Sequence, residues 1–333
     1  MTRNYIEEID LLWQRQLTEW DALIKNYGNL ANVTTRVVEL GDSSIVLQYN
    51  PERLRSSAAN IDAASLKARP CFLCNENQPH EQESVVWNGS YKIQVNPYPI
   101  FTRHLTISAT EHTPQCIAGR LTDMMLLAKD LLDYVVFYNG PMSGASAPDH
   151  MHFQAGIIYE LPICDELFNA STALFDANNQ GIFGVITDLG RPVFYIETMN
   201  TDLGELWLNS LLDVLPVKNG HIEPMVNILC WHNSGSWCIA VFPRRKHRPA
   251  CYGTGEDQFV ISPASLDMGG LWAIAREEDY NNLTLHDVRL IYQDVCLSPE
   301  DVEDVSNKLR QYYYSKKITH YGTSSPSKSR YHE

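Results

Sequence analysis

The sequence predicts an α+β fold, because stretches with helical spacing of apolar residues alternate with short strand-like runs that come in pairs. Turn sequences such as Gly41-Asp42-Ser43-Ser44 and Asn233-Ser234-Gly235-Ser236 separate runs rich in Val, Ile, Tyr and Phe, as in hairpins. Of the 333 residues, 44% are hydrophobic, which is enough for two domains or for one large domain. Mixed hairpins and helices are typical of the α+β class.

The first half of the chain should begin with a helix and continue with paired strands. Apolar residues including Ile9, Leu12 and Leu17 recur near helical spacing over residues 5–27. Residues 51–70 are polar and rich in Ala and Ser, which indicates a loop with a short helix. The remaining expected elements are strands over 34–40, 44–50, 91–101 and 104–109, a helix over 120–138, a loop over 139–149 and a strand over 150–158.

The second half repeats this style of alternation. Its expected elements are a hairpin of 184–190 and 191–199, a helix over 203–215, two strands within 225–245, a strand over 269–275, and helices over 283–295 and 298–314. The last helix opens with Ser298-Pro299-Glu300-Asp301, a favourable helix start. The similar element order permits a pseudo-duplication without demonstrating one. We expect halves over 1–165 and 166–318, followed by a polar, disordered tail over 319–333.

Charge and composition narrow the class of partner. The formal charge is −14, which disfavours a nucleic-acid partner unless a local basic patch exists. The start of the chain does not resemble a signal peptide, and no run approaches the roughly 18 apolar residues of a membrane span. We therefore expect a soluble, cytoplasmic protein with reduced cysteines and no membrane partner. Neither GxGxxG nor GxxxxGK[ST] occurs, which counts against dinucleotide and P-loop sites.

One short stretch carries the strongest chemical signal. The sequence PDHMHFQAG begins at residue 148, and in a strand it would place His150, His152 and Gln154 on one face and apolar residues on the other. A half-exposed strand with two incidental histidines would explain this alternation equally well. The preceding loop, NGPMSGASAPD, is rich in small residues that let backbone N–H groups approach an anion. A histidine beside such a loop indicates phosphorus chemistry.

These residues resemble the nucleotidyltransferase branch of the histidine-triad superfamily, which includes galactose-1-phosphate uridylyltransferases, diadenosine tetraphosphate phosphorylases and GDP-L-galactose phosphorylases. Its hallmark, His-x-His-x-Gln after an Asn…Gly-x-Ser loop, is matched by Asn139, Gly144-Ala145-Ser146, His150, His152 and Gln154. The spacing from Ser146 to His150 is one residue longer than the family pattern, so Ser143 is an alternative to Ser146. Softer matches extend the resemblance over most of residues 70–305. It implies histidine-triad-like antiparallel sheets flanked by helices.

The resemblance also implies a reaction. His152 would attack the α-phosphorus of a nucleotide sugar or dinucleoside polyphosphate, and phosphate or a sugar phosphate would accept the nucleotidyl group. Gln154 would donate to a phosphate oxygen, with Asn139, Ser143, Gly144 and Ser146 binding substrate. Because glutamine cannot shuttle protons, this triad favours a transferase or phosphorylase over a hydrolase. A nucleotide hydrolase on the same scaffold and a non-enzymatic, zinc-stabilised nucleotide-binding protein remain alternatives. Magnesium could assist, although no sequence feature requires it.

Cys71 and Cys74 have the CxxC spacing of a zinc knuckle, a weak signal when it stands alone. The resemblance to the uridylyltransferases implies a structural zinc ion held by Cys71, Cys74, His112 and His150. The alternative is two reduced core thiols and a His150 that only forms hydrogen bonds.

A basic run, FPRRKHRP, stands out in this acidic chain and contains Arg244 and Arg245. Bidentate arginine is a natural partner of phosphate, so both residues are candidates for substrate binding. A solvated turn after a strand explains the run equally well. The sequence leaves the nucleobase, the sugar, the acceptor and the oligomeric state open.

Overall fold

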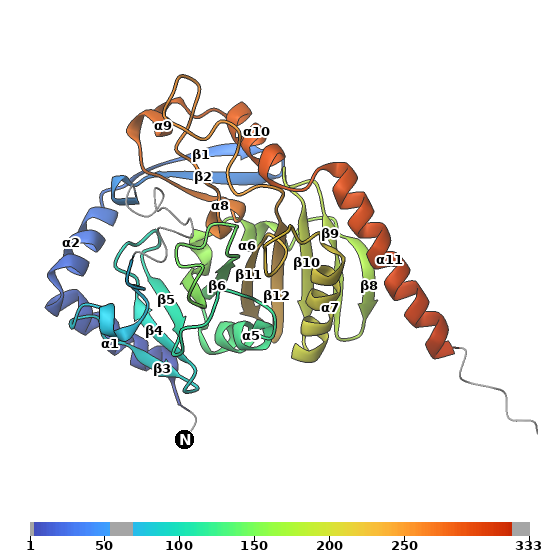
Figure 1. The fold of residues 1–333 in the computed structure, drawn as a ribbon, viewed down its shortest axis with the longest axis horizontal. Helices are drawn as coiled ribbons and strands as arrows, with labels where there is room; N and C mark the ends of the chain where they lie inside the picture. The colour runs from blue at the N-terminus through green and yellow to red at the C-terminus, as the bar shows by residue number, and fades with distance from the viewer. Residues whose placement is uncertain (1–2, 54–68, 322–333) are drawn as a thin grey trace, which may run out of the picture.

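The computed structural model describes residues 3–53 and 69–321, and its centre is a ten-stranded sheet (Figure 1). Neighbouring strands run antiparallel in the order β3-β4-β5-β7-β6-β11-β12-β10-β9-β8. The strands are β3 (Val85–Trp87), β4 (Tyr91–Val95), β5 (His104–Ala109), β6 (Tyr134–Asn139), β7 (His152–Ile157), β8 (Ala173–Asn178), β9 (Gly181–Ile186), β10 (Val193–Thr198), β11 (Val226–Asn233) and β12 (Ser236–Pro243). The predicted α+β class with antiparallel sheets and flanking helices is confirmed.

The two halves of this sheet have the same connectivity. In the first half, β3, β4 and β5 precede helix α5 (Leu121–Asp130), and the hairpin β6–β7 follows it. In the second half, β8, β9 and β10 precede helix α7 (Thr201–Val214), and the hairpin β11–β12 follows it. The halves meet where β6 pairs with β11, with Asn139 opposite Asn227. The boundaries expected for the halves, at residues 165 and 318, stay predictions.

Two layers cover the sheet, one on each face. On one face lie α1 (Tyr5–Glu19), α5, α7 and α11 (Pro299–Tyr321), with α2 (Asp21–Leu30) beside α1. On the other lies a three-stranded sheet of β1 (Thr34–Leu40), β2 (Ser43–Tyr49) and β13 (Leu271–Ile274), accompanied by α6 (Ile163–Glu166), α8 (Ser265–Met268), α9 (Glu277–Asn282) and α10 (Leu285–Val295). Each face therefore has its own apolar core.

Strand β7 contributes to the first of these cores in the alternation expected of a strand. Met151, Phe153, Ala155 and Ile157 pack against the helical layer. Because side chains alternate along a strand, His152 and Gln154 point to the opposite face, under the second layer. The strand begins at His152, so His150 lies in the turn that precedes it.

The expectation of one helix over 120–138 is wrong. Helix α5 ends at Asp130, the chain turns through Asp133 at φ 68°, and residues 134–139 form the buried strand β6. A strand buried on both faces is a continuous apolar run, which periodicity alone does not separate from a helix. The helix expected over 5–27 is also two helices. They are divided at Trp20, whose extended backbone lets the indole pack into the core.

Two expectations fall largely outside the described residues. The loop over 51–70 is described only at η1 (Pro51–Arg53) and from residue 69 on, and the tail only to Tyr321, which still belongs to α11. Two further 3-10 segments are η2 (Asn75–Asn77) and η3 (Ile158–Glu160). None of the helices within the described part of the chain is both long and apolar enough to cross a bilayer.

Candidate active site and metal centre

His152 is held as a neutral imidazole at the start of β7. The side chain is 4% exposed, and burial lowers its pKa to about 4. Its Nδ1 lies 2.8 Å from the carbonyl oxygen of His150. Because a carbonyl can only accept, Nδ1 carries the proton and Nε2 keeps its lone pair. The ring is therefore fixed in the tautomer that a nucleophile or a ligand at Nε2 requires.

Gln154 presents its amide in one defined orientation. The backbone N–H of Ile100 donates to Nδ1 of His104 at 3.1 Å, so the proton of that ring is on Nε2. This Nε2 donates to Oε1 of Gln154 at 3.0 Å, and Nδ2 of Asn96 lies 3.4 Å from the same oxygen. With Oε1 facing two donors, the NH₂ group of Gln154 is the part of the amide that remains to donate outward.

Asn139 ties the loop before β7 to the second layer of the fold. Its Oδ1 accepts from the backbone N–H of Ser265 at 2.8 Å, from the Ser265 hydroxyl at 2.7 Å and from Nδ2 of Asn227 at 2.9 Å. Gly144 follows at φ 101°, and a Cβ there would lie 2.7 Å from that of Ala264. A larger residue would therefore push the loop away from residues 264–265.

Only part of that loop borders open space. Ser143 is fully buried, its Oγ has no partner among the described residues, and its carbonyl accepts from Asn227. Gly144 and Ser146 line a pocket of about 90 Å³ against residues 260–274, with Arg248 from the basic run on its wall. Ser146, and not Ser143, is the serine that this pocket exposes.

The two arginines singled out from the sequence do not meet at this pocket. Arg244 is 4% exposed and donates to the carbonyl oxygens of Val295, Pro263, Lys246 and His247 and to Oδ1 of Asn227. Its guanidinium thus holds the basic run in place. Arg245 donates to the carbonyl of Gln293 and lines a different cavity.

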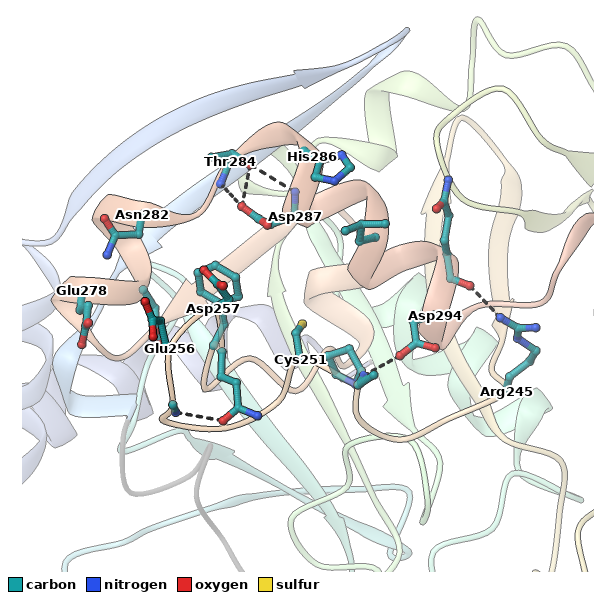
Figure 2. Close-up of a pocket in the computed structure, with 18 residues that line it drawn as sticks. Arg245, Cys251, Glu256, Asp257, Glu278, Asn282, Thr284, His286, Asp287 and Asp294 are labelled. Carbon is teal, nitrogen blue, oxygen red and sulfur yellow. Dashed lines mark hydrogen bonds between the residues drawn. The ribbon is translucent and has the colours of Figure 1, made fainter.

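That second cavity has a volume of about 1040 Å³, and most of its charged lining residues are acidic (Figure 2). It lies between the loop at 249–259 and helices α9 and α10. The carboxylates on its wall are Glu256, Asp257, Glu278, Asp279, Asp287 and Asp294, against the single guanidinium of Arg245 among the described lining residues. Such a wall repels a polyphosphate, so the smaller pocket beside Gly144 is the better candidate for binding phosphate groups.

Cys71, Cys74, His112 and His150 come together as a cluster that could hold a metal ion. Their ligand atoms all lie within 4.8 Å of one another. Nδ1 of His150 is 3.3 Å from Sγ of Cys71 and 3.5 Å from Sγ of Cys74, and Nδ1 of His112 is 3.2 Å from Sγ of Cys74. Tetrahedral coordination of zinc at ordinary bond lengths separates sulfur from nitrogen by about 3.6 Å. The spacing therefore fits a four-coordinate ion after a small expansion.

The surroundings of the cluster also fit a metal. Nε2 of His150 donates to the carbonyl oxygen of Ala109 at 2.9 Å, which leaves the lone pair of Nδ1 facing the sulfurs. Nε2 of His112 lies 4.0 Å from a carboxylate oxygen of Asp149. The Ala109 carbonyl is an outer partner of the kind that orients a histidine ligand, whereas Asp149 lies beyond hydrogen-bond distance of His112. Four protein ligands would close the site, so its role would be structural.

The fold has counterparts of known structure. Yeast Ap4A phosphorylase superposes with a TM-score of 0.57 at 19% identity, covering 86% of this chain and 97% of that one. Its complex with Ap4A gives 0.56 at 19% identity, with the same coverage. Its complex with AMP gives 0.54 at 19% identity, covering 85% and 95%. The chain therefore has the fold of yeast Ap4A phosphorylase. The expected resemblance is thus confirmed at the level of the fold.

Sequence comparisons add less. A family model described as a domain of unknown function, DUF4922, matches residues 12–157, which is less than half of the chain. The matched segment nevertheless contains the metal cluster, His152 and Gln154. No curated protein matches the chain significantly.

Sequence reasoning missed several polar residues that build the site. Gln115, Asn227 and Ser265 are fully buried and form hydrogen bonds to Asn139 and to His152 of β7. Asn227 had a visible signal, because it interrupts the apolar run MVNILCW. Gln115 had none, since it stands in an irregular segment between β5 and α5.

Proposed function

We propose that this protein is a nucleotidyltransferase of the phosphorylase type, with a covalent nucleotidyl-His152 intermediate. The donor would be a dinucleoside polyphosphate or a nucleotide sugar, and the acceptor phosphate or a sugar phosphate. The fold shared with yeast Ap4A phosphorylase supports this class of donor. The observation that carries the proposal is the buried, neutral His152 with Nδ1 committed to a carbonyl oxygen.

The proposed reaction has two displacements at one phosphorus atom. The lone pair of His152 Nε2 forms a bond to the α-phosphorus, and the P–O bond to the leaving phosphate group breaks with its electron pair on oxygen. An oxygen of the acceptor phosphate then attacks the same phosphorus, and Nε2 leaves with its lone pair. Throughout, the proton stays on Nδ1 and is donated in a hydrogen bond to the carbonyl oxygen of His150, which stabilises the positive charge that develops on the ring.

Gln154 distinguishes this reaction from hydrolysis. Its NH₂ group is free to donate to a non-bridging oxygen, where negative charge develops. It has no titratable proton with which to activate water. An acceptor that is already anionic needs no such activation, so phosphate is favoured over water.

We place the phosphate groups of the substrate in the pocket beside Gly144 and Ser146. Nε of Arg248 and Oγ of Ser262, both on its wall, are buried without a partner among the described residues. The guanidinium of Arg248 stacks 4.1 Å above the ring of Tyr252, which limits its orientations. Arg248, instead of Arg244 or Arg245, is our candidate for the arginine that binds phosphate.

We further propose that the ion held by Cys71, Cys74, His112 and His150 is zinc, since two thiolates and two imidazoles suit it. It would brace the turn that carries His150, whose carbonyl sets the tautomer of His152. Elemental analysis of the purified protein tests this, with one zinc ion expected per chain.

The reaction is tested with diadenosine tetraphosphate and with GDP-, UDP- and ADP-sugars, each with and without phosphate. We expect turnover that requires phosphate and an acid-labile nucleotidyl adduct on His152, detected by intact-protein and peptide mass spectrometry. His152→Ala should abolish both, and His286→Ala, in the acidic cavity, is the matched control. Equal turnover without phosphate would favour a hydrolase. Binding without any adduct would favour a nucleotide-binding protein, and turnover by His152→Ala would refute the mechanism.

A further inference from the structure

We propose that Gln115 is a positioning residue for the nucleophile, an inference that rests on the proposed function. Gln115 is fully buried and lies outside the regular elements, between β5 and α5. It is separated from His152 by 37 residues of chain, yet its amide contacts the backbone of His152 directly.

The pairing of β6 with β7 stops just before the catalytic position. The ladder runs from Tyr134 opposite Ile157 to Phe137 opposite Gln154. Continued for two residues, the same register would set Asn139 opposite His152. Both residues are instead bridged by a side chain, so the hairpin is open at the point where the nucleophile sits.

The amide of Gln115 fills this opening. Its Oε1 accepts from the backbone N–H of His152 at 2.8 Å, and its Nε2 lies 3.0 Å from the carbonyl oxygen of His152 and 2.9 Å from that of Asn139. A primary amide offers the same acceptor and donors as a peptide group. Gln115 thus takes the place of the missing strand partner while keeping β6 and β7 apart.

The neighbouring backbone holds Gln115 in this position. Its own N–H donates to the carbonyl of Pro148 at 3.1 Å, and the carbonyl of Thr113 accepts from Met151 at 2.7 Å. Residues 113–115 therefore run along the segment that leads into β7. The orientation of the amide follows from its partners, because a flipped amide would set an N–H against an N–H and an oxygen against two carbonyls.

This bridge matters because His152 must reach phosphorus along a fixed line. On the β6 side its backbone is held by Gln115, on the other side it pairs with Ser108 of β5, and its ring is fixed by the carbonyl of His150. Losing Gln115 leaves the tautomer and the pairing with β5 intact but releases the β6 side of the strand, so the Cα of the nucleophile can shift. A displacement of about 1 Å at a reacting group costs on the order of 100-fold in rate.

The test compares Gln115→Met and Gln115→Glu with wild type, using diadenosine tetraphosphate as the donor. Methionine keeps the length of the side chain and loses all three hydrogen bonds. Ionised glutamate keeps an acceptor for the N–H of His152 and loses both donors. We expect adduct formation in a single turnover to slow by about 100-fold in each variant, with the apparent KM within about threefold of wild type.

Amide hydrogen exchange provides a readout that does not depend on turnover. The His152 amide should exchange faster in Gln115→Met and stay protected in Gln115→Glu, because only the second retains the acceptor. Gln16→Met is the control. Gln16 lies in α1, is buried and donates to the backbone carbonyl of Glu81. The Gln16→Met variant should be less stable than wild type, but its nucleotidyl adduct should form at the wild-type rate.

Two results would overturn the inference. One is adduct formation by Gln115→Met at the wild-type rate, and the other is equal slowing in Gln16→Met, which would indicate a general loss of stability. If wild type forms no adduct with any donor, the proposed function fails. In that case the hydrogen-exchange measurement alone tests whether Gln115 positions His152. Unchanged protection of the His152 amide in Gln115→Met would refute that role.

Discussion

Replacing His247 by glutamine should change how the stability of the protein depends on pH. The ring of His247 is partly buried beside Arg248 and Arg244, and burial together with these two charges lowers its pKa to about 4. In the unfolded chain the pKa of a histidine is about 6.5. Between these values the unfolded state takes up a proton that the folded state does not, so acid lowers the free energy of unfolding.

The size of this effect follows from the two pKa values. At pH 7 residue 247 is almost fully deprotonated in the folded state and mostly deprotonated in the unfolded state, so the contribution is a few tenths of a kcal/mol at most. At pH 5 the proton taken up by residue 247 in the unfolded state lowers the free energy of unfolding by about 2 kcal/mol. Glutamine does not titrate, so the free energy of unfolding of His247→Gln, relative to wild type, should rise by about 2 kcal/mol from pH 7 to pH 5.

Chemical denaturation of both proteins at pH 8, 7 and 5 measures this difference. Both proteins contain the same cluster of Cys71, Cys74, His112 and His150, so any effect of acid on that cluster cancels in the comparison. The difference should be nearly equal at pH 8 and pH 7 and larger at pH 5. A difference that is the same at all three values would refute the reasoning.

Three further predictions concern packing, the basic run and the metal. Gly156→Ala should destabilise the fold by about 1–3 kcal/mol, because its Cβ would lie 2.1 Å from the ring of Phe101. Gly28→Ala, which meets nothing within 4 Å in α2, should instead stabilise it by about 0.5–1 kcal/mol, as thermal unfolding would show. Arg244→Lys should cost roughly 2–4 kcal/mol, seen in denaturation, without raising the KM for phosphate; a selective rise in that KM would contradict a structural role. Cys74→Ser should reduce bound zinc well below one per chain and lower the Tm, whereas an unchanged metal content would exclude the cluster as the site.

The sequence predicted the parts of the site that depend on local spacing. His152 and Gln154 share a face because the period of a strand is two, and this needs no knowledge of the rest of the fold. The metal cluster joins Cys71 to His150 across 79 residues, and only the family resemblance anticipated it.

The parts that were missed depend on distant partners. Strand β6 is apolar on both faces because one apolar core covers each face of the central sheet, and its sequence alone reads equally well as a helix. Gln115 and Asn227 are ordinary polar residues until the fold sets them against Asn139. Their roles become visible only when the fold shows which residues at the ends of strands lack a backbone hydrogen-bond partner.

The pairing of β6 with β11 makes the half that carries His152 dependent on the other half, whose hairpin strand β12 contains no histidine. Cutting the chain after residue 165 would keep His152, Gln154 and all four cysteine and histidine ligands. It would also leave β6 as a bare edge strand, and Asn139 would lose both Asn227 and Ser265 as donors. The second half therefore stabilises the first by pairing with its edge strand β6 and by donating hydrogen bonds to Asn139. Because one continuous sheet joins them, the two halves have no hinge between them about which they could open or close.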